Sequence, residues 1–410
     1  MEQPGASSSA IFVLPTTTDA QIGPVAGWIS TSGWAAAAQR QMGSAWIVTR
    51  HGVLTVEQTR ERAAGSDSSR GGARRMRGLI PPVLKTLVKD AREAQRAARF
   101  LIDVSGPWDG GPPVELVWQR HELFHQAGLD LARKLEVPSV LFVPALTVWQ
   151  AERWAVRRPG WGGWLEQHAE RPALLRADLV ACGTDVIAEQ AARLGVSDER
   201  LIVTPTGVDL ALFAGASDRA ATRRLLGIDG SSLVIGWVGS FRAFHAIDQL
   251  VHAAGRVDDV TLLLVGDGPE RPRIERLAET LGVTARFTGT VAHGELPSLL
   301  RAMDVGAVMA RPSEPFHYSP LKVAEYLAAG LPVVAPRVAQ LADRLDHDVN
   351  ARLFEPGSVR DMAGALEAIA VDSALRARLA EGARRSASDW SWDRQIERVR
   401  AALRDVPLGW

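Results

Sequence analysis

The chain has 410 residues, of which 46% are hydrophobic and 23% charged, and its 47 basic residues balance its 47 acidic ones. This length exceeds what one hydrophobic core usually supports, so we expect two domains. The zero net charge gives no reason to expect nucleic acid or an anionic membrane as a partner of the whole chain. The single cysteine, Cys182, excludes an internal disulfide framework and a cysteine-rich metal site.

The ends and the apolar runs of the chain indicate where the protein works. The opening residues MEQPGASSSA lack the basic region and apolar core of a secretory signal. No apolar run approaches the roughly 18 residues that a transmembrane helix needs. We therefore expect a cytoplasmic protein.

The first half of the chain alternates short apolar runs with helical patterns. Residues 10–17 predict a buried strand, followed by a loop with Gly23 and Gly27, a helix over 27–42 and a strand over 44–49. This order is typical of the start of a doubly wound parallel sheet. Further strands are predicted over 99–105, 114–119, 138–145 and 177–183, and a helix over 123–136.

After a strand and a glycine turn over 200–213, the alternation begins again, with strands predicted over 232–240, 260–270, 285–291, 305–310 and 332–336. Two successive arrays predict an α/β protein with two Rossmann-like domains of parallel strands facing a cleft. Ligands of such sheets bind beyond the carboxyl ends of the strands. We expect one domain over 10–207, a second over 208–388, and a helix within 389–410 that returns toward the first.

The segment SPLKVAEYLAAGLP, residues 319–332, predicts a helix with both ends marked. Ser319 suits the N-cap and Pro320 the first helical position. Gly330 stands where a left-handed residue commonly ends a helix. The N-terminus of such a helix offers free amides to an anion.

This helix also holds Lys322, one of only four lysines among the 47 basic residues. Lys322 and Glu325 are three residues apart and therefore share a face. An ammonium near the helix start suits a phosphate, and a carboxylate one turn later suits the vicinal diol of a ribose. Together they indicate a nucleotide; the alternative is an exposed ion pair worth a few tenths of a kcal/mol.

Five motifs together resemble one known family. They are ADLVACGTDVIAEQAARLGVSDERLIVTPTGVDLALF (177–213), WVGSF (237–241), LLLVGDGPE (262–270), RFTGTV (286–291) and SPLKVAEYLAAGLPVVA (319–335). In their order and spacing they resemble the family 4 glycosyltransferases of GT-B fold. The resemblance covers most of the chain. It implies a retaining enzyme of the hexosyltransferase type that moves a sugar from a nucleotide-diphosphate sugar, UDP- or GDP-linked, to an acceptor.

The resemblance also implies roles for residues of the donor site. Glu325 would bind the ribose hydroxyls, Lys322 and Arg242 would neutralise the diphosphate, and the turn at 289–291 would lie near the base. The implied donor-binding residues are Gly239, Ser240, Arg242, Gly289, Val291, His317, Ser319, Pro320, Leu321, Lys322 and Glu325.

In the first half, VWQRHELFHQAG (117–128) resembles the family's strand followed by His-Glu. His121 then falls at the active-site histidine, and we expect it to be catalytic together with Lys322 and Arg242. His125, one turn later, would serve helix packing or acceptor contact. The residues expected on the acceptor side are Gly23, Gly27, His125 and Trp149.

The sequence departs from the family's pattern at the sugar. The family commonly carries two glutamates eight positions apart, and the position eight before Glu325 is His317. Glu314 could serve if the loop is three residues longer, so Glu314 and His317 both stay candidates. The family's usual Arg and Lys after the first glycine of the second domain are here Ser240 and His245.

The segment 148–172 gathers four of the 13 tryptophans among several arginines. It could pack on the domain, bind the acceptor, or make a peripheral membrane contact. We expect no metal ion, because no carboxylates cluster with ligand spacing, and no cofactor besides the nucleotide sugar. Two rival functions stay open: a sugar-nucleotide epimerase of the same fold and a non-catalytic sugar-nucleotide-binding protein.

Overall fold

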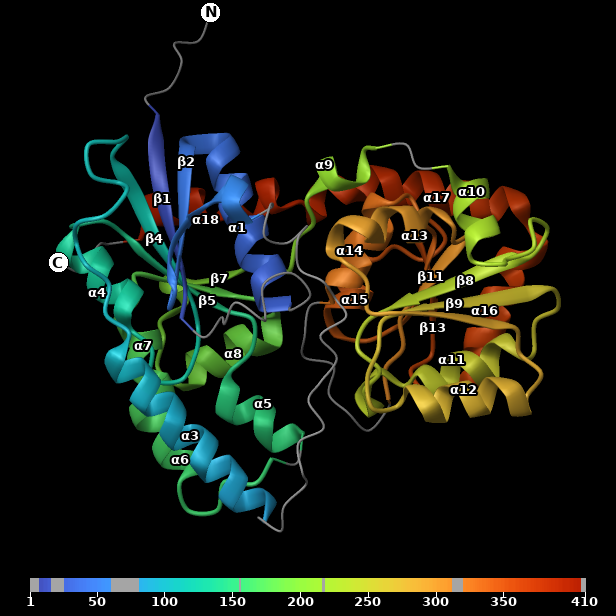
Figure 1. Cartoon of the computed structure of the whole chain (residues 1–410), viewed down its shortest axis with the longest axis horizontal. Coiled ribbons are helices and arrows are strands. Elements are labelled where there is room, and N and C mark those ends of the chain that lie inside the picture. Colours follow the sequence, from blue (N-terminus) through green and yellow to red (C-terminus); the bar gives the residue numbers. More distant parts are fainter. Residues whose placement is uncertain are drawn as a thin grey trace, which may run out of the picture. The chain divides into compact units, whose positions relative to one another are not determined.

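The computed structural model describes residues 7–15, 26–59, 81–154, 156–215, 218–311 and 320–406. These residues form two compact units, each with helices on both sides of a sheet (Figure 1). The first unit ends at Thr206 and includes the C-terminal helix from Trp392; the second runs from Gly207 to Ser391. No helix among the described residues is long and apolar enough to cross a membrane.

The first unit holds a seven-stranded sheet in the order β3-β2-β1-β4-β5-β6-β7. Neighbouring strands are parallel, except that β3 pairs antiparallel with β2. The strands are β1 (Ser8–Leu14), β2 (Gly43–Thr49), β3 (Gly52–Thr55), β4 (Val114–Arg120), β5 (Ser139–Val143), β6 (Leu179–Cys182) and β7 (Leu201–Val203). The central strands are apolar on both faces because helices cover both.

The helices of this unit are α1 (Ala26–Met42), α3 (Pro82–Arg99), α4 (Ala127–Lys134), α5 (Thr147–Arg153), α6 (Gly162–Leu165), α7 (Arg171–Arg176), α8 (Asp185–Arg193) and α18 (Trp392–Asp405). The strand predicted over 99–105 is wrong: α3 continues to Arg99, and residues 100–105 form no strand. Leu101 in this stretch is 83% exposed, so the run is apolar without being buried.

Helix α4 begins four residues later than the pattern predicted, because a turn precedes it. The Gln119 side chain donates to the carbonyl of His125 at 2.7 Å and accepts from the amide of Gly128 at 2.7 Å. Phe124 in this turn has a φ of +69°. The buried side chain of Gln119 therefore makes the hydrogen bonds that these backbone groups would otherwise make within a longer helix.

The second unit holds a six-stranded, fully parallel sheet in the order β10-β9-β8-β11-β12-β13. Its strands are β8 (Leu233–Val238), β9 (Val260–Val265), β10 (Ala285–Gly289), β11 (Val305–Ala307), β12 (Val333–Pro336) and β13 (Ala351–Phe354). The strand order reverses between β8 and β11. The connections that leave these two strands run in opposite directions along the sheet. The crevice between them, at the carboxyl ends of the strands, is where ligands of open α/β sheets bind.

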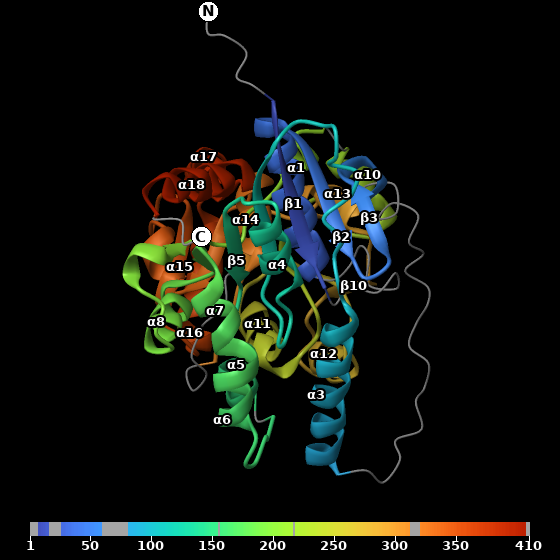
Figure 2. The ribbon, with the colours of Figure 1, turned by 90° about the vertical axis from the view of Figure 1, so that its left-hand side faces the viewer.

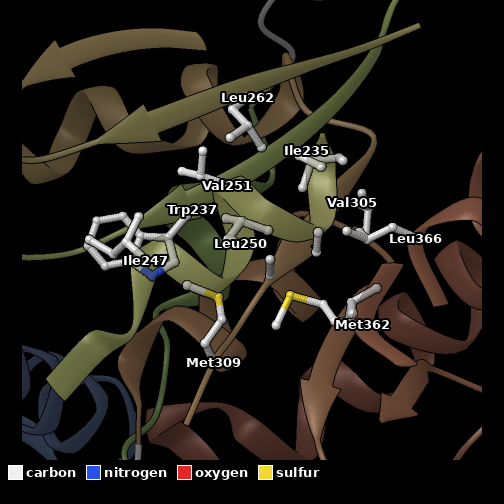
Figure 3. Close-up of a cluster of buried hydrophobic side chains, with 14 of the residues drawn as sticks. Ile235, Trp237, Ile247, Leu250, Val251, Leu262, Val305, Met309, Met362 and Leu366 are labelled. Atoms are coloured by element: carbon white, nitrogen blue, oxygen red, sulfur yellow. The ribbon is translucent and has the colours of Figure 1, made fainter. Parts of the chain in front are cut away.

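The helices of the second unit are α9 (Leu210–Phe213), α10 (Arg219–Leu225), α11 (Ile247–Ala254), α12 (Arg271–Thr280), α13 (Leu296–Arg301), α14 (Leu321–Ala328), α15 (Ala339–Arg344), α16 (Val359–Val371) and α17 (Ser373–Ser386). Its core joins β8 and β9 to α11 and α16, with Trp237, Leu250 and Met362 among the buried side chains (Figure 3).

Helix α14 ends as the sequence predicted. Gly330 has a φ of +69°, and its amide donates to the Leu327 carbonyl at 2.9 Å, while the Leu331 amide reaches the Tyr326 carbonyl at 2.9 Å. These two bonds form a Schellman motif. At the other end, Pro320 is the N-cap and not the first helical residue. Ser319, the predicted N-cap, lies outside the described residues.

Helix α18 packs within the first unit through its first turn. The Trp392 ring lies 5.5 Å from the Trp34 ring of α1. Asp393 accepts from Arg40 at 2.8 Å and 2.6 Å. The helix approaches α1 at Gly33, where a Cβ would lie 2.1 Å from the Trp392 Nε1 atom.

We therefore expect Gly33→Ala to lower the free energy of unfolding by about 1–3 kcal/mol, because the methyl group must displace Trp392. Gly364→Ala in α16 is the control, since a Cβ there meets nothing within 4 Å. It should be neutral or stabilising by up to about 1 kcal/mol. Thermal melting of both variants tests this contact. If the two substitutions change the melting temperature equally, the contact between Gly33 and Trp392 is absent in solution.

Candidate functional site

The ends of β8, β9 and β10 come together through glycines. Gly266, after β9, has a φ of +123°, and a Cβ there would lie 2.0 Å from the carbonyl oxygen of Gly239, the residue after β8. The Gly266 amide donates to the Gly289 carbonyl at 2.9 Å. Only residues without a side chain permit this approach. The carboxyl edge of the sheet is therefore a floor of exposed backbone.

Lys322, in the first turn of α14, reaches this floor. Its Nζ atom lies 4.4 Å from the centroid of the Trp237 ring and 3.1 Å from where a Cβ of Gly239 would be. Among the described residues its ammonium has neither a hydrogen bond nor an ion pair. Burial lowers the pKa of Lys322 to about 7, although the Glu325 carboxylate opposes this shift. Below about pH 7 the side chain is therefore a buried cation held on an aromatic face.

Glu325 lies one turn later and is held by a residue that the sequence analysis did not single out. Its Oε1 atom lies 2.9 Å from the Nε2 atom of His293. Lys322 is 8% exposed and Glu325 only 5%. The alternative of an exposed Lys–Glu pair is therefore wrong. Lys322 lies against Trp237, and Glu325 contacts His293.

A second histidine, His245, also contacts Trp237. Its ring packs edge-on against Trp237 with the centroids 5.6 Å apart. Burial, with the nearby positive charges of Lys322 and Arg242, lowers the pKa of His245 to about 2. Its imidazole is therefore neutral at physiological pH. The charge on this side comes from Lys322 and Arg242, whose side chain is exposed.

The structure brings most of the predicted donor residues to one edge of the second unit. Gly239, Ser240 and Arg242 follow β8, Gly289 ends β10 with Val291 two residues later, and Pro320, Leu321, Lys322 and Glu325 begin α14. Glu314, His317 and Ser319 lie outside the described residues, so the choice between Glu314 and His317 stays open. His293 and Trp237 were missed; the only signal for His293 is its place two residues after Val291.

In the first unit, His121 directly follows β4. Its Nε2 atom lies 2.9 Å from Oε1 of Glu170, and neither side chain is exposed. Glu170 also accepts from the amides of Thr147 and Val148, which begin α5. The Nδ1 atom of His121 is buried without a hydrogen-bond partner among the described residues. The pair thus ties β4 to α5, and a catalytic role for His121 stays a prediction.

The residues predicted on the acceptor side are scattered over this unit. His125 is buried, with Nε2 2.9 Å from Glu93 of α3 and its ring against Phe100, so its contacts here are packing. Trp149 lies under the guanidinium of Arg153 at 3.4 Å. A Cβ on Gly27 would lie 3.4 Å from Arg120. Gly23 lies outside the described residues.

Comparison with known proteins agrees with this geometry. Residues 232–372, which contain β8 to β13 and α14, match the family described as glycosyl transferases group 1. This segment is similar to the group 1 glycosyltransferases. A D-inositol 3-phosphate glycosyltransferase of Actinosynnema mirum is 34% identical over 58% of this chain and 60% of its own length. One of Geodermatophilus obscurus is 36% identical over 57% and 54%. The chain thus spans little more than half the length of these relatives.

Solved structures share the fold of this chain. Anabaena HepE, in complex with UDP, has a TM-score of 0.63 at 18% identity, over 96% of this chain and 100% of its own. The sucrose-phosphate synthase of Thermosynechococcus elongatus has a TM-score of 0.64 at 19% identity, over 97% and 99%. The prediction of an α/β, GT-B fold with two parallel-sheet domains is confirmed.

The burial of Lys322 predicts how stability depends on pH. The pKa of Lys322 is lower in the folded state than its ordinary value of 10.5, so between about pH 7 and 10.5 the unfolded chain binds more protons. The buried charge of Lys322 therefore destabilises the folded state fully below about pH 7 and no longer does so above about pH 10.5. Lys322→Met should therefore raise the melting temperature of the free protein clearly at about pH 6 and little at about pH 10.

Lys134→Met, at an exposed position of α4, is the matched control for this measurement. It removes one lysine without relieving any burial. If Lys322→Met and Lys134→Met shift the melting temperature equally at both pH values, Lys322 is not buried in solution.

Proposed function

We propose that the protein is a retaining glycosyltransferase that uses a nucleotide-diphosphate sugar, and that the second unit binds this donor. The observation that carries the proposal is the ammonium of Lys322, which has no hydrogen-bond or ion-pair partner among the described residues and is held on Trp237 beside the glycine floor. A buried cation is destabilising unless an anion reaches it, and a diphosphate is such an anion. The amides at the start of α14 add to its stabilisation.

In this proposal Glu325 and the end of β10 bind the rest of the donor, its ribose and its base. Glu325 accepts hydrogen bonds from the two ribose hydroxyls, while His293 holds the carboxylate in place. The base lies near Gly289 and Val291. We favour uridine over guanosine because a solved structure of HepE, which shares the fold, contains UDP and another contains UDP-glucose.

Charge development explains the use of Lys322. As the bond between the anomeric carbon and the diphosphate breaks, negative charge gathers on the leaving oxygen, and a cation fixed beside it stabilises the transition state. The acceptor oxygen bonds to the same face of that carbon, and its proton leaves with the diphosphate. We propose that Lys322 and Arg242 supply the positive charge and that the reaction needs no metal ion.

For the acceptor we propose a chemical class and no single compound. The two relatives above are named for transfer to inositol 3-phosphate, and we propose a phosphorylated polyol as the acceptor. We also propose that the protein works in the cytoplasm.

Incubation with UDP-glucose and a panel of polyol phosphates tests the proposed activity. Mass spectrometry should find a glycosylated product, and NMR should show that its anomeric configuration matches that of the donor. Conversion of the donor without any acceptor would instead identify the epimerase. Tight UDP binding without turnover on any acceptor would identify the non-catalytic binding protein.

Glu325→Ala should weaken UDP binding by about 1–3 kcal/mol, because two hydrogen bonds to a charged acceptor are lost. Isothermal titration calorimetry measures the change. The control is Glu367→Ala on the exposed surface of α16, which should leave the affinity unchanged. Equal affinities for all three proteins would remove Glu325 from the donor site.

Lys322→Met should weaken UDP binding far more than uridine binding, since only UDP carries the diphosphate. Lys322→Arg keeps the charge but replaces a compact ammonium by a planar fork, so it should keep part of the affinity and lose more of the turnover. Dissociation constants for UDP and uridine with both variants decide the question. Equal losses for the two ligands would contradict a phosphate contact.

A further inference from the structure

Helix α3 packs on the first unit with its acidic side. Of its 18 residues only Asp90 is buried. Asp90 accepts from Arg158 at 2.8 Å and 3.0 Å and from Trp161 Nε1 at 3.0 Å. Glu93, one turn later on the same face, meets His125 at 2.9 Å. The two carboxylates that the helix carries are thus both used in attaching it to the unit.

One flank of α3 is apolar and exposed. Leu84, Leu87 and Val88 are between 41% and 47% exposed. Their spacing of three and four residues places them in one stripe along the helix, and the exposed Ala91 continues it. An ordinary surface helix turns such a stripe toward the core, whereas the stripe of α3 is left exposed.

A row of cations runs beside the apolar stripe. Its members are Lys85, Lys89, Arg92, Arg96 and Arg99, all exposed and spaced four or three residues apart. The spacing aligns them along one side of the helix. Within the part of the chain that the structure describes, the one ion pair that these cations make is that of Arg96 with Glu93 at 3.2 Å. The outward surface is both apolar and strongly positive.

Two exposed tryptophans lie on the neighbouring segment. Trp154 follows α5 and is 46% exposed, and Trp164 in α6 is 53% exposed. Arg158 and Trp161, between them, are the residues that bond to Asp90 of α3. Figures 1 and 2 both show α3, α5 and α6 extending toward the same end of the first unit. Tryptophan, with an apolar body and one N–H group, suits the boundary between lipid and water.

We propose that α3, together with Trp154 and Trp164, binds the surface of an anionic lipid bilayer. The helix lies in the plane of the interface, its apolar stripe among the acyl chains and its cations at the headgroups. A second copy of the chain fits poorly, because two rows of like charge would meet. Nucleic acid leaves the leucines and Val88 without a partner. The segment 148–172 expected to touch a membrane thus contributes, but the main element is α3.

Sedimentation of the full chain with vesicles tests the proposal. The protein should bind vesicles that contain phosphatidylglycerol and not vesicles of phosphatidylcholine alone, and binding should weaken as salt is added. Leu84→Ser with Leu87→Ser should lower the partition coefficient at least about tenfold. Lys85→Gln with Lys89→Gln should lower it and reduce its dependence on salt.

The matched control is Arg224→Gln with Leu225→Ser on α10, which removes an exposed cation and an exposed leucine from the second unit. It should bind vesicles as the wild type does. Circular dichroism and UDP affinity, which the α3 variants should retain, separate this surface from the donor site. No binding to anionic vesicles at low salt, equal losses in the control, or self-association that the α3 variants abolish would each overturn the proposal.

Discussion

The position of α14 is the constraint on which the candidate site depends. Its Tyr326 hydroxyl accepts from the Val238 amide at the end of β8 at 3.1 Å. The Tyr326 ring fills the space above β11, where a Cβ on Gly306 would lie 2.5 Å from it. The Schellman motif at Gly330 ends the helix at a fixed residue. With its C-terminal end and one face fixed, the helix places its first turn so that Lys322 lies over Trp237.

The same fixed helix explains why Glu325 and His293 meet. His293 begins a short 3₁₀ turn (His293–Glu295) after β10, and its preceding amide, that of Ala292, is held by Glu295 at 3.1 Å. Two rigid elements therefore place an imidazole and a carboxylate in contact before any ligand arrives. A carboxylate that is already oriented loses less conformational entropy on binding a diol. In the proposed donor site this contact is therefore preorganised, between the turn after β10 and helix α14.

Much of this could be predicted from the sequence, and the failures have one cause. Periodicity located most strands of both sheets, and helix-end residues located α14 with Lys322 and Glu325. The run over 99–105 was as apolar as a true strand, yet no neighbouring strand pairs with it. β3 and β13, of four residues each, were missed because their pairing partners, and not their own pattern, make them strands. The contact of His293 with Glu325 joins residues 32 apart, and no local pattern marks it.

The net charge of the chain is another property from which the surface could not be predicted. A net charge of zero correctly describes the chain, but it is a sum, and a surface responds to the charges within about one Debye length. In α3 the acids face inward and pair with Arg158 and His125, so the outward side keeps its cations. Composition cannot distinguish a helix that buries its carboxylates from one that displays them. The orientation of a single helix therefore decides whether a neutral protein presents a positive surface.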